Sequence, residues 1–136
     1  LLMERAKAVA EGREVLGRLV DYSVVGVEPK YMGIGPVPAI REILARSNLS
    51  VSDIDLYEVN EAFAAQALAV ARELELPSER LNPNGSGIGL GHPIGATGAV
   101  VTVKALYELR RIGGRYAMVS LCIGGGQGIA ALFERM

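Results

Sequence analysis

Two hydrophobic patterns alternate along the chain. Stretches dense in β-branched residues, or alternating between apolar and polar residues, favour strands, whereas apolar residues that recur every three or four positions favour helices. These patterns predict strands over residues 15–29, 54–60, 115–122 and 129–135. They predict helices over residues 4–12, from Pro38 onward, over 61–76 and over 99–113. Strands that alternate with helices indicate an α/β domain built in layers.

Glycine and proline mark the ends of several of these elements. Gly12 and Gly113 fit the residues that end helices, and Pro77 stops the helix over 61–76. The last two strands are joined by a short glycine-rich turn, so they must be antiparallel. The length suits one domain, which we assign to residues 1–136.

Charge and composition exclude several classes of protein. The formal net charge is −1, which indicates no basic surface for nucleic acid or for an anionic membrane. No apolar run reaches the ~18 residues of a membrane span, and no signal peptide is visible. The single cysteine excludes an internal disulfide and a multi-cysteine metal site. We therefore expect a cytoplasmic protein without a metal or other cofactor. The opening Leu-Leu-Met is typical of the end of a buried strand, and we expect the chain to be a piece of a longer one.

Residues 82–98 form a glycine-rich segment. Six of these 17 residues are glycine, but apolar and ring residues interrupt them, unlike in a flexible linker. Residues 85–91 are similar to a dinucleotide-binding fingerprint. However, no clear strand directly precedes them and no P-loop Lys-Ser/Thr pair follows, so this match is weak.

Two polar residues stand at junctions between elements. Asn60 joins a strand to a helix: it either caps the helix, or its carboxamide orients a water or a substrate oxygen. His92, the only histidine, precedes a helix start and is either a loop residue bonded to backbone or an acid–base group. The helix N-terminus disfavours imidazolium, so a neutral ring there can accept a proton or donate to an oxyanion.

Cys122 ends an apolar run and precedes three glycines. A buried, inert cysteine is the usual interpretation of such a residue. The glycines favour another, because a strand that turns sharply here aims several N–H groups into one concavity that can stabilise an oxyanion. A thiol with an ordinary pKa near 8.5 also serves as an acid or base after modest tuning.

Three motifs together resemble the thiolases. They are Asn-Glu-Ala-Phe-Ala-Ala-Gln at residues 60–66, the segment from Asn82 to Ala99 that contains Gly-His-Pro, and Cys-Ile-Gly-Gly-Gly-Gln-Gly at residues 122–128. They occur in the family's order, and the resemblance covers essentially the whole chain. Within the second motif, the sequence Asn-Pro-Asn-Gly-Ser-Gly most resembles that of the bacterial β-ketothiolases. The resemblance implies an acyltransferase that cleaves 3-ketoacyl-CoA with coenzyme A or condenses two acyl-CoA molecules.

The resemblance also assigns roles to individual residues. Cys122 matches the cysteine that moves the α-proton of the acyl-CoA, and His92 the histidine that activates the nucleophilic thiol and binds the thioester oxygen. Asn60 matches the residue that fixes a water in the oxyanion hole to which this histidine belongs. The Gly124 backbone matches part of a second oxyanion hole, which faces the acyl-enzyme. Two further residues look like the apolar lining of the pantetheine and acyl tunnel: Met32 and Phe63.

Only the C-terminal half of the family is matched. The family's nucleophile is a cysteine of the N-terminal half, and this chain has no second cysteine. We therefore expect the isolated chain to be inactive without an N-terminal domain. The resemblance implies a five-stranded mixed sheet with helices on both faces, an apolar face from residues 61–71 or from the helix after His92 turned towards the missing half, and homo-oligomers. Two alternatives are a ketoacyl-synthase-like condensing enzyme, against which the single histidine counts, and a non-catalytic subunit that binds nucleotide or coenzyme A.

Overall fold

The computed structural model describes residues 1–136 and contains one mixed sheet of four strands. The strands are β1 (Gly17–Gly26), β2 (Leu56–Val59), β3 (Tyr116–Ile123) and β4 (Gln127–Arg135). Their order across the sheet is β1-β4-β3-β2. Strands β2 and β3 are parallel, whereas β4 is antiparallel to both of its neighbours, which confirms the predicted final hairpin.

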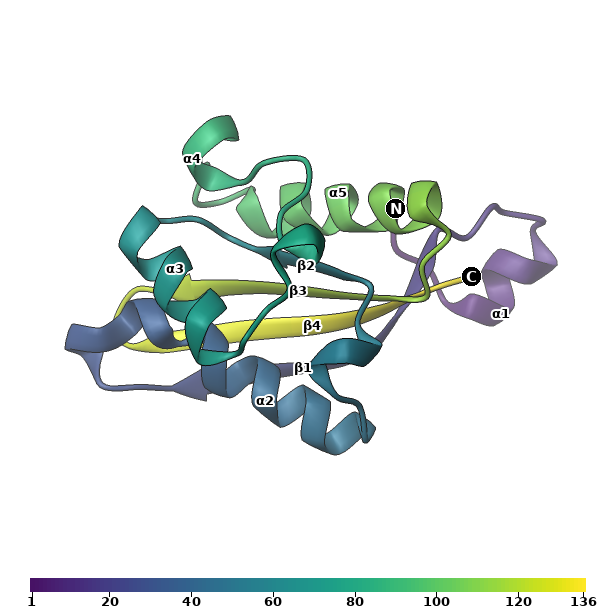
Figure 1. Cartoon of the computed structure of the whole chain (residues 1–136). Coiled ribbons are helices and arrows are strands. Elements are labelled where there is room, and N and C mark those ends of the chain that lie inside the picture. The colour runs from purple at the N-terminus through teal and green to yellow at the C-terminus, as the bar shows by residue number, and fades with distance from the viewer.

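Helices cover both faces of this sheet, as predicted (Figure 1). The helices are α1 (Arg5–Ala10), α2 (Pro36–Ser47), α3 (Ala64–Glu73), α4 (Gly87–Leu90) and α5 (Thr97–Ile112). Three short 3-10 turns lie between them: η1 (Pro29–Ile34), η2 (Val51–Asp53) and η3 (Ser78–Arg80). Helices α2 and α3 lie with η1 on one face, and α5 lies on the other (Figure 1). None of the helices is both long and apolar enough to cross a membrane.

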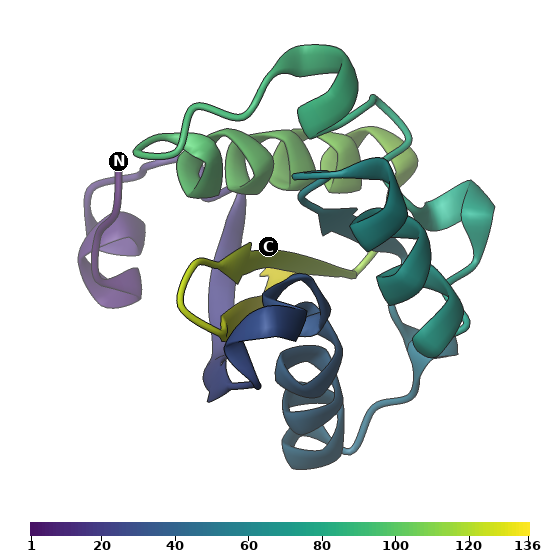
Figure 2. The ribbon, with the colours of Figure 1, turned by 90° about the vertical axis from the view of Figure 1, so that its left-hand side faces the viewer.

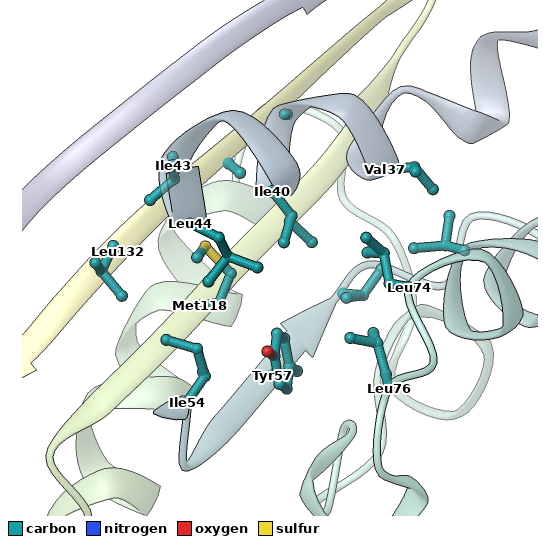
Figure 3. Packing of buried hydrophobic residues seen from close by; sticks show 14 residues of the cluster. Val37, Ile40, Ile43, Leu44, Ile54, Tyr57, Leu74, Leu76, Met118 and Leu132 are labelled. Atoms are coloured by element: carbon teal, nitrogen blue, oxygen red, sulfur yellow. The ribbon is translucent and has the colours of Figure 1, made fainter. Parts of the chain in front are cut away.

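Each face of the sheet has its own hydrophobic cluster. On the α2 face, Ile40 and Ile43 pack with Tyr57 of β2 and Met118 of β3 (Figure 3). On the α5 face, a smaller cluster joins the helix to β2 and β3: Leu56, Val101, Ala105, Leu109, Ala117 and Val119. Full burial of one such aliphatic side chain contributes about 1.5–3 kcal/mol, so these clusters fix the helices on the sheet.

The sheet has four strands, so the expectation of five is wrong. The sequence patterns themselves predicted four, and the fifth came from the family resemblance. At the free edge of β2, Leu81 makes one isolated parallel bridge to Tyr57. Asn82 follows with a φ of 47°, a left-handed conformation that turns the chain away from the sheet. Its side chain completes the pairing instead: Val59 N–H donates to Asn82 Oδ1 at 2.9 Å, and Asn82 Nδ2 donates to the Val59 carbonyl at 2.9 Å.

Two sequence predictions at element ends are also corrected. The helix predicted over 61–76 is shorter, because residues 60–63 precede its first turn and Glu75 has a φ of 53° that ends it. The opening residues are not a strand: Leu1 and Leu2 are exposed and precede α1. By contrast, α5 ends at Gly113 in a left-handed conformation, as predicted.

The outer surfaces of α3 and α5 are unusually apolar. Only Val70 of α3 is buried, and Leu68 on the same helix is 55% exposed. Along α5 and the segment before it, a row of large apolar side chains faces outward: Ile88, Leu90, Ile94, Val100, Val103 and Tyr107. Large apolar side chains that are exposed in such numbers favour a surface to which another surface binds.

Candidate active site

Asn60 lies buried at the end of β2. Its backbone N–H donates to the Ser120 carbonyl at 2.9 Å, which carries the pairing with β3 one residue further. It does not cap a helix, since α3 begins at Ala64 with Phe63 in the capping position. Its side chain is 0% exposed, yet neither Oδ1 nor Nδ2 has a hydrogen-bond partner in the chain. An unpaired buried amide is unfavourable by about 1–3 kcal/mol, so the carboxamide is available to bind something else.

The glycine-rich segment approaches Asn60 closely. A side chain at Gly87 would come within 3.0 Å of Asn60 Oδ1 and within 2.5 Å of the Glu61 carbonyl. Only glycine fits there. Glu61 also accepts a hydrogen bond from Asn82 Nδ2 at 3.1 Å, so the two motifs are joined directly.

The ring of His92 is held by the first residue of α5. His92 Nδ1 lies 2.7 Å from the Thr97 hydroxyl, which donates its own proton to the Pro93 carbonyl at 2.8 Å. The hydroxyl has one proton, so it acts as the acceptor towards His92. With the hydroxyl proton directed at the Pro93 carbonyl, a neutral ring carries its own proton on Nδ1 and leaves a lone pair on Nε2, the form needed to accept a proton.

Cys122 lies near the end of β3, opposite Gly128 of β4. The thiol is half-buried, so it is not sealed in the core. Burial raises its pKa above the ordinary value, which keeps the thiol protonated near neutral pH. A side chain at Gly128 would come within 2.1 Å of the Gly35 backbone, so the junction of η1 and α2 packs directly against the hairpin beside Cys122.

The turn after Cys122 is shaped by two glycines. Gly125 and Gly126 have φ values of 87° and 90°, and the Gly126 carbonyl accepts a hydrogen bond from Val27 N–H at 2.8 Å. Gly124 precedes them and is exposed, with open space where a side chain would project. Its backbone N–H donates to no acceptor in the chain.

Asn60, His92, Cys122 and Gly124 all lie at one end of the sheet. Strands β2 and β3 are parallel, with Val59 beside Ser120, so Asn60 follows the end of β2 and Cys122 lies near the neighbouring end of β3. Helix α5 ends just before β3 begins, so its N-terminus, which holds His92, lies at the opposite end, where β3 finishes. Figure 2 faces this end and shows α4, the start of α3, η1 and the β3–β4 turn around it. How closely the side chains converge stays a prediction.

Met32 and Phe63 lie on two segments that pack side by side. Met32 is half-buried in η1, and Phe63 is 64% exposed before α3. A side chain at Gly33 would come within 2.8 Å of Gln66 Cγ, which shows how closely η1 and α3 approach. A cavity of about 330 Å³ lies between the two segments, but neither residue lines it: Tyr31, Gly33, Ile34, Gln66 and Ala69 do.

A second cavity, of about 310 Å³, lies between α3 and residues 81–88. It is mostly apolar, with Glu61 and Asn82 as its polar residues. None of the six predicted site residues lines either of these two cavities. No group of three or more His, Cys, Asp or Glu side chains is placed to hold a metal ion.

Sequence reasoning missed two residues that support this site. Thr97 orients His92, and Asn82 ties the glycine-rich segment to β2. A threonine at the first position of a helix five residues after a histidine carries little signal in the sequence. Asn82 stands within a motif, but its role depends on the edge of β2, which only the fold reveals.

Comparisons with known proteins agree on one family. Residues 13–135 match the family model described as "Thiolase, C-terminal domain". The chain is 63% identical over 136 residues to the beta-ketothiolase BktB of Cupriavidus necator, covering all of this chain and 34% of that protein. The solved acetyl-CoA acetyltransferase of Bacillus anthracis superposes with a TM-score of 0.96 at 54% identity, over 98% of this chain and 34% of that one. The solved human mitochondrial 3-ketoacyl-CoA thiolase in complex with CoA superposes with a TM-score of 0.94 at 49% identity. This match covers 97% of this chain and 34% of that one. The chain thus spans about a third of the length of the relatives it matches.

Proposed function

Because the chain belongs to the thiolase family as its C-terminal domain, we propose that it supplies acid–base and oxyanion-binding groups for acyl transfer to or from coenzyme A. The reaction is thiolytic cleavage of a 3-ketoacyl-CoA, or its reverse, the condensation of two acyl-CoA molecules. The observation that supports the proposal is that Asn60 follows β2, Cys122 lies near the end of the neighbouring parallel strand β3, and His92 lies in the loop before α5.

Cys122 is the proposed acid and base at the α-carbon. In cleavage, the bond between the α- and β-carbons breaks and its electron pair passes to the α-carbon. The thiol, kept protonated by its raised pKa, donates the proton that completes the acyl-CoA product. In condensation the proton moves the other way, from the α-carbon to a Cys122 thiolate.

His92 and Asn60 are proposed to act at the thioester carbonyl. The free Nε2 of His92 accepts a proton from the nucleophilic thiol and then, protonated, donates to the carbonyl oxygen. The unpaired carboxamide of Asn60 binds the water or oxygen beside it. The free N–H of Gly124 contributes to a second hole for the acyl-enzyme.

A second thiol is required for this cycle, and the chain has one cysteine. We propose that an N-terminal thiolase domain supplies the nucleophile and covers the apolar surface of α3 or that of α5, which lie on opposite faces of the sheet. Met32 and Phe63 would then line the tunnel for the pantetheine and acyl groups. By itself the chain would be inactive. A homo-oligomeric assembly and a cytoplasmic location belong to the same proposal.

A chimaera tests this function. The matched third of the Cupriavidus necator beta-ketothiolase is replaced by this chain, which is 63% identical to it over 136 residues. The chimaera should cleave acetoacetyl-CoA in the presence of coenzyme A, whereas the isolated chain should not. A folded chimaera that binds coenzyme A without turnover would favour the non-catalytic alternative. Turnover by the isolated chain would refute the need for a second domain.

A further inference from the structure

An ion pair is buried in the shortest strand of the sheet. Glu58 lies in the middle of β2 and is 0% exposed, and its Oε2 lies 2.9 Å from Lys104 Nζ of α5. The Lys104 side chain is 18% exposed. A buried ion pair is often no more stabilising than apolar residues of the same size. Stability alone therefore does not account for this pair in an otherwise apolar strand.

Lys104 has a second partner outside the strand. Its ammonium group also donates to the Gly85 carbonyl in the glycine-rich segment. Helix α5 thus holds the glycine-rich segment at Gly85 through a charged side chain.

Strand β2 holds the same loop from the other side. Asn82 makes two hydrogen bonds to the Val59 backbone, and Ser86 Oγ donates to the Val59 carbonyl at 3.3 Å. Residues 82–86, which we name the anchor loop, are therefore fixed between β2 and α5. Lys104 is the one side chain that binds both the strand and the loop.

The anchor loop leads directly to both proposed oxyanion groups. Gly87, the residue after it, packs against the unpaired Asn60 side chain. The chain then runs through α4 to His92, whose ring is held on α5 by Thr97. A shift of the anchor loop relative to α5 would therefore move Gly87 against Asn60 and strain the placement of His92.

We propose that Lys104 is a positioning residue for acyl transfer, which fixes the anchor loop through the Gly85 carbonyl and the Glu58 carboxylate. This role rests on the proposed function, and Lys104 itself need not touch substrate. Glu58 orients the ammonium group. Burial raises the pKa of Glu58 while the Lys104 hydrogen bond lowers it, so the carboxylate takes up a proton more readily once the lysine is removed.

The first test measures the loop itself and needs no activity. In the isolated chain, Glu58→Leu combined with Lys104→Met replaces the pair by apolar side chains and keeps the core filled. Amide hydrogen exchange should become about tenfold faster or more at residues 85–91, which comprise the end of the anchor loop and the residues that lead from it towards His92. Exchange in β3 and β4 should be unchanged. The ring NMR signals of His92, the only histidine, should shift. Unchanged loop exchange and unchanged His92 signals would overturn the proposal.

Two single variants support this test. Glu58→Gln leaves an oxygen that accepts from Lys104, so the loop should keep its native exchange rates; fast exchange in this variant would contradict the role given to Lys104. Lys104→Met alone should reproduce the fast loop exchange. If the double variant does not fold, native loop exchange in this single variant would overturn the role given to Lys104.

The second test uses the chimaera. The double variant should lower kcat by about 10- to 100-fold with little change in KM, because small misplacements of reacting groups have effects of this size. The matched control is Arg110→Met, at a residue on the same helix as Lys104. It removes the exposed ion pair between Arg110 and Glu14 and should leave kcat unchanged. A kcat of the double variant equal to that of the parent chimaera would overturn the proposal. An inactive parent chimaera would instead count against the proposed function, and loop exchange would still decide the role of Lys104.

Discussion

The Nδ1 atom of His92 lies 2.7 Å from the Thr97 hydroxyl oxygen, whose proton is donated to the Pro93 carbonyl. This relay links the only histidine to the buried first residue of α5. The Thr97 hydroxyl is therefore positioned to select the tautomer of the exposed His92 ring.

Replacing Thr97 by valine should release the tautomer of His92. The valine keeps the shape of the side chain but offers no oxygen, so both neutral tautomers should be seen by ¹⁵N NMR where the parent chain shows only the Nδ1–H form. In the chimaera, kcat should fall by about 10- to 100-fold. Thr97→Ser keeps the hydroxyl and should behave as the parent. A single Nδ1–H tautomer in the valine variant would contradict this account.

Asn60→Leu should separate stability from activity. The variant removes a buried amide whose two polar atoms have no partner, so the free energy of unfolding should be unchanged or rise by about 1–3 kcal/mol. Activity of the chimaera should fall by about 10²–10³-fold, the usual effect of removing one group from an oxyanion hole. Urea unfolding and steady-state kinetics measure the two effects. A large loss of stability would show that Asn60 serves the fold instead.

The thiol of Cys122 should ionise at a higher pH in the folded chain than in the unfolded chain. Burial raises its pKa, so alkylation by iodoacetamide should need a more alkaline solution than it does in urea. The same shift means that the folded state loses stability as the pH rises through this range, because the unfolded thiol ionises first. The single cysteine makes the measurement unambiguous. Equal alkylation profiles in the folded and unfolded chains would refute the assignment.

Two glycines of the hairpin should respond very differently to alanine. Gly128→Ala places a methyl group within 2.1 Å of the Gly35 backbone and should destabilise the chain by about 1–3 kcal/mol or more. Gly124→Ala meets open space and should leave the free energy of unfolding nearly unchanged. Thermal unfolding of the two variants provides the comparison. Equal stabilities would mean that η1 can move away from the hairpin.

Much of the fold could be read from local patterns. The four strands, the antiparallel final hairpin and the end of α5 at Gly113 follow from residue type and short-range geometry, and the structure confirms them. The predictions that were wrong concern places where contacts between segments far apart in sequence determine the local structure. The fifth strand is replaced by the side chain of Asn82, and residues 61–63 precede the helix after Asn60 instead of forming its first turn.

The same division holds for the candidate site. The sequence by itself determined which residues are chemically able to act, because one histidine, one cysteine and an asparagine stand at element ends beside glycines. Only the tertiary structure decided that Asn60 is buried without a partner, that Thr97 holds Nδ1 of His92, and that Lys104 joins β2 to the anchor loop. Each of these depends on atoms brought together by the parallel pairing of β2 with β3 and by α5 packed across them. No local pattern in a chain encodes such contacts between segments far apart in sequence.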